Sequence, residues 1–548
     1  MHTALAKPHY TLRGGELVPK MTGDFPVERS NRLWDTSNKG AGWTRDVADW
    51  NPRRGSADAD ILRDLPMLTG RSRDIERNNG VANGIVRTLT DNVVGTGFRL
   101  VPRPNYLALG KDKAWADDWS LKVSALWWQW AETTACDAAD TMTFDQITTQ
   151  ILTGQILNGS ALALPLWLPD RNDGFATKLQ TVEADRLSNP NGEPDSQRRR
   201  GGIEFDEYGA PVAYHVRKVH PGDFLIAGVQ NVTDMFTWET IPRRTPFGRA
   251  RVLHVFDPQR SQQSRGKPLL SSVLSEFKNV DRYTMAELQA AVVNAMIALV
   301  IQTPMDPEQV AHLFGNNMDK YLAFRDEHHV RLQAGSAISL NPGDTAQSFL
   351  PQRPASGFGA FLENMHRIIG LPAGLPYELV MKDFSKTNYS SARASMLEAW
   401  RSFLRCRDWL GTQWCDPVYD LWLEEMVNAG RIEAAGFYDK RAAWTRCRWI
   451  GPGRGWVDPV KEAQAAQIRM ASFITTLEDE CAETVGGDWR EKLDQAAVER
   501  EYKVAKGLPP DLVVQMSRQV QEHPVDDTSP GAASADPQGT PDETAAAA

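Results

Sequence analysis

The chain has 548 residues, of which 41% are hydrophobic and 24% are charged, and this composition is typical of folded globular proteins. It excludes disorder, collagen and a coiled-coil rod as the main state, and the length suits about three domains or one large elaborated domain. The formal net charge is −9, from 61 Lys and Arg against 70 Asp and Glu. Because static nucleic-acid-binding proteins are usually basic over their whole surface, any contact with DNA must be local or weak.

The cysteines and the N-terminal segment bear on the cellular compartment. The five cysteines are an odd number without a CxxC pair or zinc-like spacing, so we expect free thiols, a reducing compartment and no structural metal. The N-terminal segment lacks the apolar core of a signal peptide, and the longest apolar run, residues 290–301, is shorter than the roughly 20 residues that cross a bilayer. We therefore expect a cytoplasmic site of synthesis, no membrane association and no cofactor.

The first part of the chain predicts an irregular arm followed by helices. Residues 1–56 mix Gly, Pro, Asn, Trp and charged residues without periodicity, so no element is predicted there. From Ala57 to Leu89 apolar residues recur every three to four positions, which predicts helices. A strand is predicted at FRLVP (98–102), and tryptophans at helical spacing predict a further helix over 111–132.

The middle of the chain changes from helices to strands and back. Thr143 and Gln146 form a capping box that begins a helix ending near residue 158. Between residues 160 and 260 short strands alternate with turns, and Glu-Tyr-Gly-Ala-Pro at 207–211 predicts a hairpin-like turn. The middle of the chain is therefore predicted to be an α+β section.

A long helix and an inserted module are predicted next. Pro268 suits the first residue of a helix that extends to residue 299, with apolar residues along one stripe. Residues 300–355 return to Pro-punctuated strands and turns, and a shorter helix is predicted over Phe358–Gly370. After a loop, a Trp-rich and Arg-rich sequence predicts one long helix over 390–427.

The C-terminal part is predicted to be helical and then disordered. One helix is predicted after Asp458-Pro459 as far as residue 480, and a last one over 489–506. Residues 523–548 are rich in Pro, Ala and acidic residues and lack Lys and Arg, which is typical of a disordered tail. The predicted fold class is α+β and mainly helical.

Motifs of catalysis are missing from the sequence. There is no GxxxxGK[ST] loop for nucleotide phosphates and no Gly-x-Ser-x-Gly nucleophile motif. The run Asp326-Glu327-His328-His329 looks metal-like, but adjacent side chains diverge, so we interpret it as a solvated loop. The Gly-rich GPGRGW at 451–456 lacks a preceding strand of βαβ type and indicates a tight turn. We therefore expect no enzymatic activity.

Basic residues form three groups whose role stays open at this point. Any of the groups could contact phosphate, but so many basic residues will cluster somewhere by chance. The helical arginines could instead pair with Glu398, with Asp408 or with an adjacent subunit. The groups are Arg198–Arg200; Arg243, Arg244, Arg249 and Arg251; and Arg401, Arg405 and Arg407.

Five blocks of sequence carry a resemblance to a known family. The most specific is DFSKTNYSSARASMLEAWRSF (383–403), preceded by GLPAGLPYELV, and it resembles the lambda-type portal proteins of tailed bacteriophages. Four further blocks of this sequence also resemble blocks of that family, in the same order, and the resemblance covers about residues 60–510. These further blocks are RSRDIERNNGVANGIVRTLTDNVVGTGFRL, VEADRLSNP with GIEFDEYGAPVAYHV, HVFDPQRSQQSRGKPLLSSVLSEF and WIGPGRGWVDPVKEAQA.

The resemblance implies a portal-type fold assembled as a ring, usually of twelve subunits, at one vertex of the capsid. Double-stranded DNA would pass through this ring during packaging and ejection, and the ring would be able to nucleate head assembly. The implied regions are an N-terminal arm (1–56), a wing (57–267 and 391–457), a first stem helix (268–299), a clip (300–355), a returning stem helix (356–374), a channel loop (375–390), a helical crown (458–522) and a disordered acidic tail (523–548).

The resemblance also implies partners and candidate sites. Implied partners are further copies of the chain, the duplex, the terminase large subunit, the major capsid and scaffolding proteins, and the head-completion or adaptor proteins, in a virion assembled in the bacterial cytoplasm. A conduit should hold DNA weakly, which suits an acidic chain with a few cations at the channel. Candidate channel-loop residues are Lys382, Asp383, Lys386 and Asn388, and candidate motor-docking residues of the clip are Arg325, Asp326, Glu327 and Arg331.

Two other functions remain as alternatives. A capsid or tail protein that oligomerises without a DNA channel would lack the long helix followed by a small inserted module. A terminase-like DNA-processing enzyme would carry a phosphate loop and an acidic metal cluster, and the sequence has neither. The lysines of the candidate loop could also be ordinary solvated residues.

Overall fold

The computed structural model describes residues 54–508, Pro52 and two N-terminal strands, β1 (Tyr10–Arg13) and β2 (Glu16–Pro19). Within 54–508 the description omits residues 172, 226–233, 235, 297–299, 303–311, 313–314, 316–318, 321–344, 348–356 and 456–457. The chain divides into two compact units, Met1–Asp60 and Ile61–Ala548.

The first unit contains an element that the sequence did not predict. Strands β1 and β2 pair antiparallel, with Leu12 opposite Leu17. The prediction of no element in this arm is therefore wrong at this point. Two adjacent glycines separate the strands in the sequence, and Gly-Gly favours the tight turns of hairpins, so the signal was local and short rather than periodic.

The helices predicted after residue 57 are confirmed, with sharper boundaries. Asn79 ends one helix and caps the next, since its side chain accepts hydrogen bonds from the backbone of Val81 and Ala82. The predicted capping box of Thr143 and Gln146 is present. The predicted helices are α1 (Ala57–Ile61), α2 (Leu65–Asn78), α3 (Gly80–Val93), α5 (Lys113–Ala131) and α6 (Phe144–Asn158). A short helix that the sequence did not predict, α4 (Tyr106–Leu109), precedes α5.

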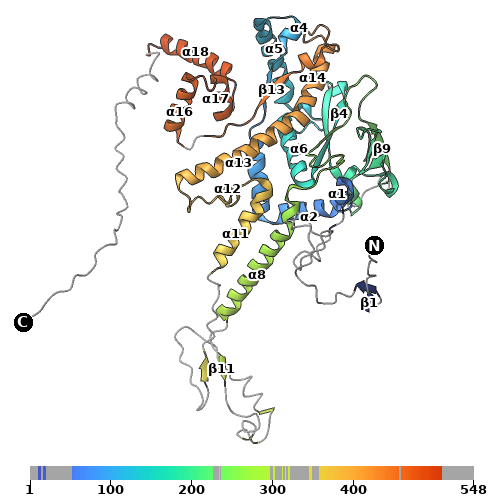
Figure 1. Cartoon of the computed structure of the whole chain (residues 1–548). Coiled ribbons are helices and arrows are strands. Elements are labelled where there is room, and N and C mark those ends of the chain that lie inside the picture. The colour runs from blue at the N-terminus through green and yellow to red at the C-terminus, as the bar shows by residue number, and fades with distance from the viewer. Residues whose placement is uncertain are drawn as a thin grey trace, which may run out of the picture. The chain divides into compact units, whose positions relative to one another are not determined.

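The α+β section consists of small antiparallel sheets, visible beside α6 in Figure 1. One has the order β10-β4-β5 and another β6-β7-β8-β9, and β3 pairs with the distant β13. The predicted hairpin at 207–211 joins β7 to β8. The strands are β3 (Arg99–Pro102), β4 (Ser160–Trp167), β5 (Thr177–Val182), β6 (Arg199–Arg200), β7 (Ile203–Phe205), β8 (Pro211–Arg217), β9 (Trp238–Pro242), β10 (Leu253–Phe256) and β13 (Cys447–Ile450).

Short 3-10 helices connect these elements. They are η2 (Thr134–Cys136), η3 (Pro169–Arg171), η4 (Ala184–Arg186), η5 (Pro190–Gly192), η6 (Pro221–Leu225), η7 (Leu269–Val273) and η8 (Leu371–Ala373).

The core of the second unit is a cluster of aromatic side chains. Trp127 lies at its centre, with ring centroids 5.0 Å from Trp130 and 5.2 Å from both Phe144 and Trp422. Trp127 and Trp130 on α5 and Trp422 on α14 are essentially fully buried. The interpretation of the tryptophans as core residues is therefore confirmed for this cluster, which joins helices far apart in the sequence.

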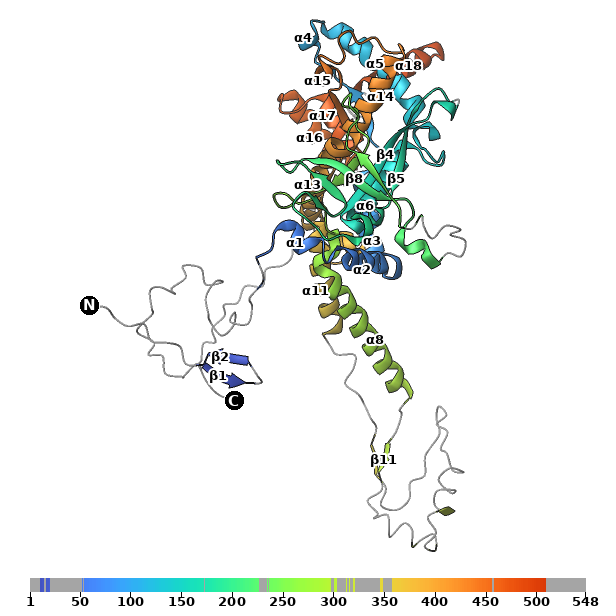
Figure 2. The same ribbon diagram turned by 90° about the vertical axis from the view of Figure 1, so that its right-hand side faces the viewer.

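Two paired helices, α8 (Leu274–Met296) and α11 (Phe358–Gly370), extend from this core (Figure 2). The Tyr283 ring on α8 packs against the Phe361 ring on α11 at a centroid distance of 4.9 Å. The helix over Phe358–Gly370 is confirmed, but the start predicted at Pro268 is wrong. Residues Leu269–Val273 form η7, and the α-helix begins only at Leu274. In the sequence between α8 and α11, strands β11 (Val300–Gln302) and β12 (Thr345–Gln347) pair antiparallel with each other.

The long helix predicted over 390–427 is present but interrupted. It consists of α13 (Tyr389–Leu410), a π-helix η9 (Gly411–Cys415) and α14 (Asp416–Asn428), and the short helix α12 (Tyr377–Met381) precedes it. The π-turn adds one residue to the helical path without breaking it, so apolar periodicity alone does not reveal it.

The C-terminal helices are α16 (Pro459–Ala471), α17 (Leu477–Thr484) and α18 (Trp489–Ala505), and a small helix α15 (Arg441–Trp444) precedes β13. The single helix predicted as far as residue 480 is wrong, because the chain turns at Phe473, which has a left-handed φ of 56°. Thr476 then caps α17 by accepting from the backbone of Asp479. Of the helices that the structure describes, none has the length and apolar character needed to span a membrane.

Candidate functional site

The predicted channel loop, 375–390, contains the helix α12 and the start of α13, so only its middle part is a loop. The four candidate residues lie in the short turn between these helices, from Lys382, which ends α12 in the left-handed conformation with φ 54°, to Asn388. The Asn388 side chain caps α13 by accepting from the backbone N–H of Ser391 at 2.8 Å. Within the turn, the Asp383 carboxylate accepts from the backbone N–H of Ser385 at 3.0 Å. Hydrogen bonds from Ser385 lower the pKa of Asp383, so this carboxylate stays ionised. The structure thus brings the four predicted loop residues into one turn.

An ion pair joins this turn to helix α11. The Lys386 Nζ lies 2.8 Å from Oε2 of Glu363, and Nη2 of Arg367 lies 2.7 Å from the other carboxylate oxygen, Oε1. The hydrogen bond from Lys386 lowers the pKa of Glu363 and raises the pKa of Lys386, so both groups are charged at neutral pH. Lys386 is therefore not the free cation that the sequence suggested.

The two lysines of the turn differ in their surroundings. Lys382 is exposed and forms no ion pair within the part of the chain that the structure describes, whereas Lys386 shares Glu363 with Arg367. Since Asp383 also lies in the turn, the local excess of positive charge is small. Such a surface would attract a phosphate backbone only weakly.

Sequence reasoning missed Glu363 and Arg367. The four-residue spacing on one helix could have indicated their pairing with each other. Nothing in the sequence links either residue to Lys386, which lies on a loop 23 positions from Glu363. The four predicted clip residues, Arg325, Asp326, Glu327 and Arg331, lie outside the described residues.

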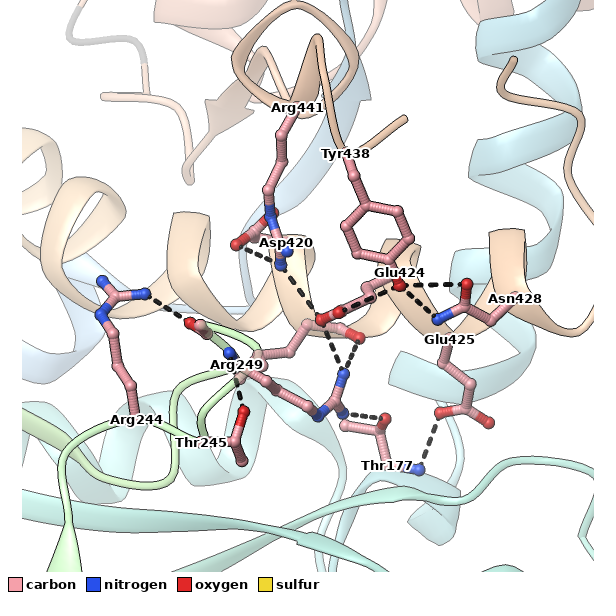
Figure 3. A network of polar contacts seen from close by, with 12 residues as sticks. Thr177, Arg244, Thr245, Arg249, Asp420, Glu424, Glu425, Asn428, Tyr438 and Arg441 are labelled. Carbon is pink, nitrogen blue, oxygen red and sulfur yellow. Dashed lines mark hydrogen bonds and ion pairs between the residues drawn. The ribbon is translucent and has the colours of Figure 1, made fainter. Parts of the chain in front are cut away.

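Arg249, from the second arginine group, belongs to a network of polar contacts around Glu424. Arg249 contacts Glu424 of α14 at 3.0 Å and donates to Thr177 of β5 at 2.8 Å (Figure 3). Arg441 binds the same Glu424 oxygen at 3.1 Å as well as Asp420, so two guanidinium groups neutralise one buried carboxylate. This network fixes α14 to the sheet.

All three helical arginines contact other residues of the same chain, Arg405 through Asp257 at 4.0 Å. Arg401 pairs with Glu398 at 3.0 Å, which confirms the internal pairing for that residue. Arg407 lies 4.5 Å from the Trp400 ring centroid and donates to the backbone carbonyl of Val93, so it joins α13 to α3. Burial lowers the pKa of Arg407 to about 10, which leaves it charged at neutral pH.

One group of side chains has the reach of a metal site. Among the described residues, Glu183, Asp185 and His220 bring ligand atoms within 4.8 Å of one another. The His220 Nε2 already pairs with Glu183 at 2.8 Å, and Asp185 pairs with Arg73. We interpret this group as a cluster of mutual polar contacts, because each of the three side chains already has a partner within the chain.

Comparison with known proteins decides the family. The family model described as phage portal protein, lambda family, matches residues 44–407, which is more than half of the chain. The chain is also 31% identical over 515 residues to portal protein B of Escherichia phage lambda, covering 90% of this chain and 94% of that protein. The chain belongs to the lambda family of phage portal proteins.

A second portal protein agrees with this family. The portal protein of Escherichia phage N15 is 31% identical over 492 residues, covering 86% of this chain and 91% of that protein. A solved neck structure of an empty gene transfer agent (GTA) particle is 15% identical with a TM-score of 0.43, covering 84% of this chain and 95% of that one. The family resemblance of the sequence blocks is confirmed, as is the mainly helical α+β fold class.

In this portal-family chain, apolar side chains are exposed along the paired helices. On α8, Met285, Leu288 and Val292 are 50–58% exposed, and their spacing places them on one face of the helix. On α11, Phe361 and Ile368 are each 44% exposed. Because monomeric proteins rarely expose a continuous row of this kind, these faces are candidates for contact between subunits.

Proposed function

We propose that this chain forms a closed ring, of twelve copies as in the sequence-based expectation, at one vertex of a phage capsid. The ring would be the passage for double-stranded DNA during packaging and ejection. The observation that carries the proposal is the row of exposed apolar side chains on α8, next to the paired helix α11. In a ring each subunit offers one face to one neighbour and a different face to the other, so such a row would be covered.

Each region of the portal fold is then assigned to a range of residues. The proposed stem is 268–299 with 356–374, the clip is 300–355, and the channel loop is 375–390. Residues 57–267 and 391–457 would form the wing, and 458–522 the crown, with arm and tail at the two ends. The clip would dock the terminase large subunit and later the head-completion proteins, while capsid and scaffolding proteins would surround the wing during assembly in the host cytoplasm.

The electrostatics of the loop suit a passage rather than a binding site. Lys386 is paired with Glu363, which leaves Lys382 as the cation of the turn without an ion pair among the described residues. Since each phosphate held by a cation adds to affinity and to its salt dependence, few such contacts keep the duplex mobile. We propose no catalytic role and no cofactor, and a motor protein would supply the energy for movement.

The size and shape of the purified protein test this proposal. We expect light scattering to give a particle about twelve times the 61.1 kDa mass of the chain, and negative-stain images to show rings with a central hole. A compact closed dimer, or a large particle without a hole, would contradict the channel and favour a structural oligomer of another kind.

A matched pair of variants tests the helix face. Val292 on α8 and Val212 on β8 are each 50% exposed. Val292→Asp should raise the concentration needed for ring formation at least about ten-fold, because a carboxylate buried without a partner is costly, whereas Val212→Asp should leave it unchanged. Equal effects of the two substitutions, measured by light scattering over a concentration series, would show that the α8 face is not an interface.

A further inference from the structure

The carboxylate of Glu363 binds two cations from different elements. One is Arg367, one turn further along the same helix α11, with 2.7 Å between Nη2 and Oε1. The other is Lys386, from the turn between α12 and α13, with 2.8 Å between Nζ and Oε2. Each carboxylate oxygen therefore has its own cation, and one of the two cations lies on the candidate channel loop.

The Lys386 contact is the tie between the middle of the turn and the rest of the chain. Among the described hydrogen bonds and ion pairs of residues 383–387, the others stay within the turn, such as Ser385 to Asp383 and Thr387 to Phe384. The turn is otherwise fixed at its two ends, by the left-handed Lys382 and by the cap at Asn388. Without Lys386 held at Glu363, residues 383–387 would have no polar attachment to α11.

Glu363 and Lys386 differ in side-chain exposure, and the more exposed lysine is the group that can leave the pair. The Glu363 side chain is 18% exposed, whereas that of Lys386 is 70% exposed. Exposed ion pairs contribute little to stability, so it costs little for the lysine to exchange the Glu363 carboxylate for another anion. Arg367 lies on the same helix as Glu363, one turn away, so a cation remains beside the carboxylate when Lys386 leaves.

We propose that Glu363 is a latch that holds the channel loop through Lys386 and releases this lysine to a phosphate of the passing duplex. Glu363 is thus a positioning residue, and Lys386 alternates between the carboxylate and DNA. The latch presupposes the proposed function, because it requires a duplex beside the turn. Since each phosphate must compete with Glu363, every contact is brief, and the loop returns to the same position after the phosphate has passed.

Hydrogen exchange on assembled full-length rings tests the latch without DNA. The variants are Glu363→Gln and Lys386→Gln, with Glu398→Gln as the control, because it makes the same substitution and breaks a helix-surface ion pair to Arg401 on α13. We expect the amides of 383–387 to exchange up to about five times faster in both latch variants and unchanged in the control, as the loss of one exposed ion pair allows. Unchanged exchange in Glu363→Gln would overturn the latch.

Binding of a fluorescent 30-base-pair duplex to the same rings, measured over a range of NaCl concentrations, tests the exchange with phosphate. Glu363→Gln should bind several-fold more tightly at low salt, with a log–log salt slope steeper by about 0.9 for each phosphate newly contacted. Adding Lys386→Gln to Glu363→Gln should remove this gain. Because Arg367 is equally released in both variants, the difference between them isolates Lys386.

The outcomes separate the latch from the proposed function. If Glu363→Gln and the double variant bind the duplex equally in rings that do bind it, the phosphate exchange is wrong while the conduit stands. If wild-type rings have no channel or take up no duplex, the conduit fails and the exchange fails with it. Faster exchange of 383–387 together with a Lys386-dependent gain in binding supports the latch.

Discussion

The aromatic core and the paired helices α8 and α11 use the same kinds of side chain in opposite ways. Around Trp127, aromatic rings from three helices are buried against one another within a single chain. Along α8 the apolar side chains of Met285, Leu288 and Val292 stay half exposed. The core therefore supplies stability to one subunit alone, while α8 has apolar area left for a neighbour.

Helix α18 exposes its apolar side chains even more completely than α8 does. None of its 17 residues is buried, and Leu493, Val498 and Tyr502 are 49–63% exposed. Ion pairs at its first turn, from Glu491 to Arg99 and from Arg490 to Asp117, hold it to the rest of the unit. Since most helix stability in proteins comes from packing of an apolar face, α18 depends on the tie at one end.

The largest effect should come from the core. Trp422→Ala should lower the free energy of unfolding by about 3–5 kcal/mol, since a fully buried ring that contacts Trp127 is replaced by a cavity. Denaturant unfolding followed by tryptophan fluorescence measures this loss. The matched control is Trp167→Ala, because that ring is 56% exposed and its loss should cost less than about 1 kcal/mol. Equal losses would mean that burial in the cluster does not determine stability.

An acid at the edge of the core should make stability depend on pH. Burial raises the pKa of Asp145 from 3.8 to about 6, although its carboxylate accepts from the backbone of Phe98. The folded state therefore binds the proton more tightly than the unfolded state, and stability should fall as pH rises from about 4 to 6, by up to about 3 kcal/mol. Asp145→Asn keeps an acceptor for Phe98 and should remove this fall. Parallel pH profiles of melting temperature for the two proteins would contradict the assignment.

The smallest effect should come from α18. Val498→Asp should change the free energy of unfolding of the single subunit by less than about 0.5 kcal/mol, because Val498 is 59% exposed on a helix without buried residues. Thermal melts at concentrations below ring assembly measure this. A loss as large as that of a core substitution would show that α18 packs within its own subunit, and the contrast between the two regions would disappear.

Local signals predicted local structure well. The helix over Phe358–Gly370 and the capping box of Thr143 and Gln146 follow from apolar spacing and from hydrogen bonds between near neighbours in the sequence. The single helix predicted as far as residue 480 failed because Phe473 adopts a left-handed conformation that no glycine marks. A bulky residue at positive φ leaves no recognisable sign in a single sequence.

The candidate site was predictable only in part. A family-like sequence block predicts the loop that contains Lys382 and Lys386, and it predicts that both lysines face the duplex. The structure gives Lys386 a partner on α11, which depends on how two segments fold back beside each other. Likewise, the two arginines that share Glu424 lie 175 and 17 positions from it, neither of which is a helical spacing, so the sequence pattern could not have joined them.

The π-helix at Gly411–Cys415 has a consequence for how the sequence of this chain can vary. An α-helix advances about 100° per residue, so deleting one residue here would restore α-geometry but rotate everything beyond it by about that angle. Tyr419 and Trp422 would then turn away from Trp127. Insertions and deletions at this point are therefore far more damaging than substitutions of an exposed residue such as Thr412, and the spacing between α13 and α14 should be more constant among relatives than the residues that fill it.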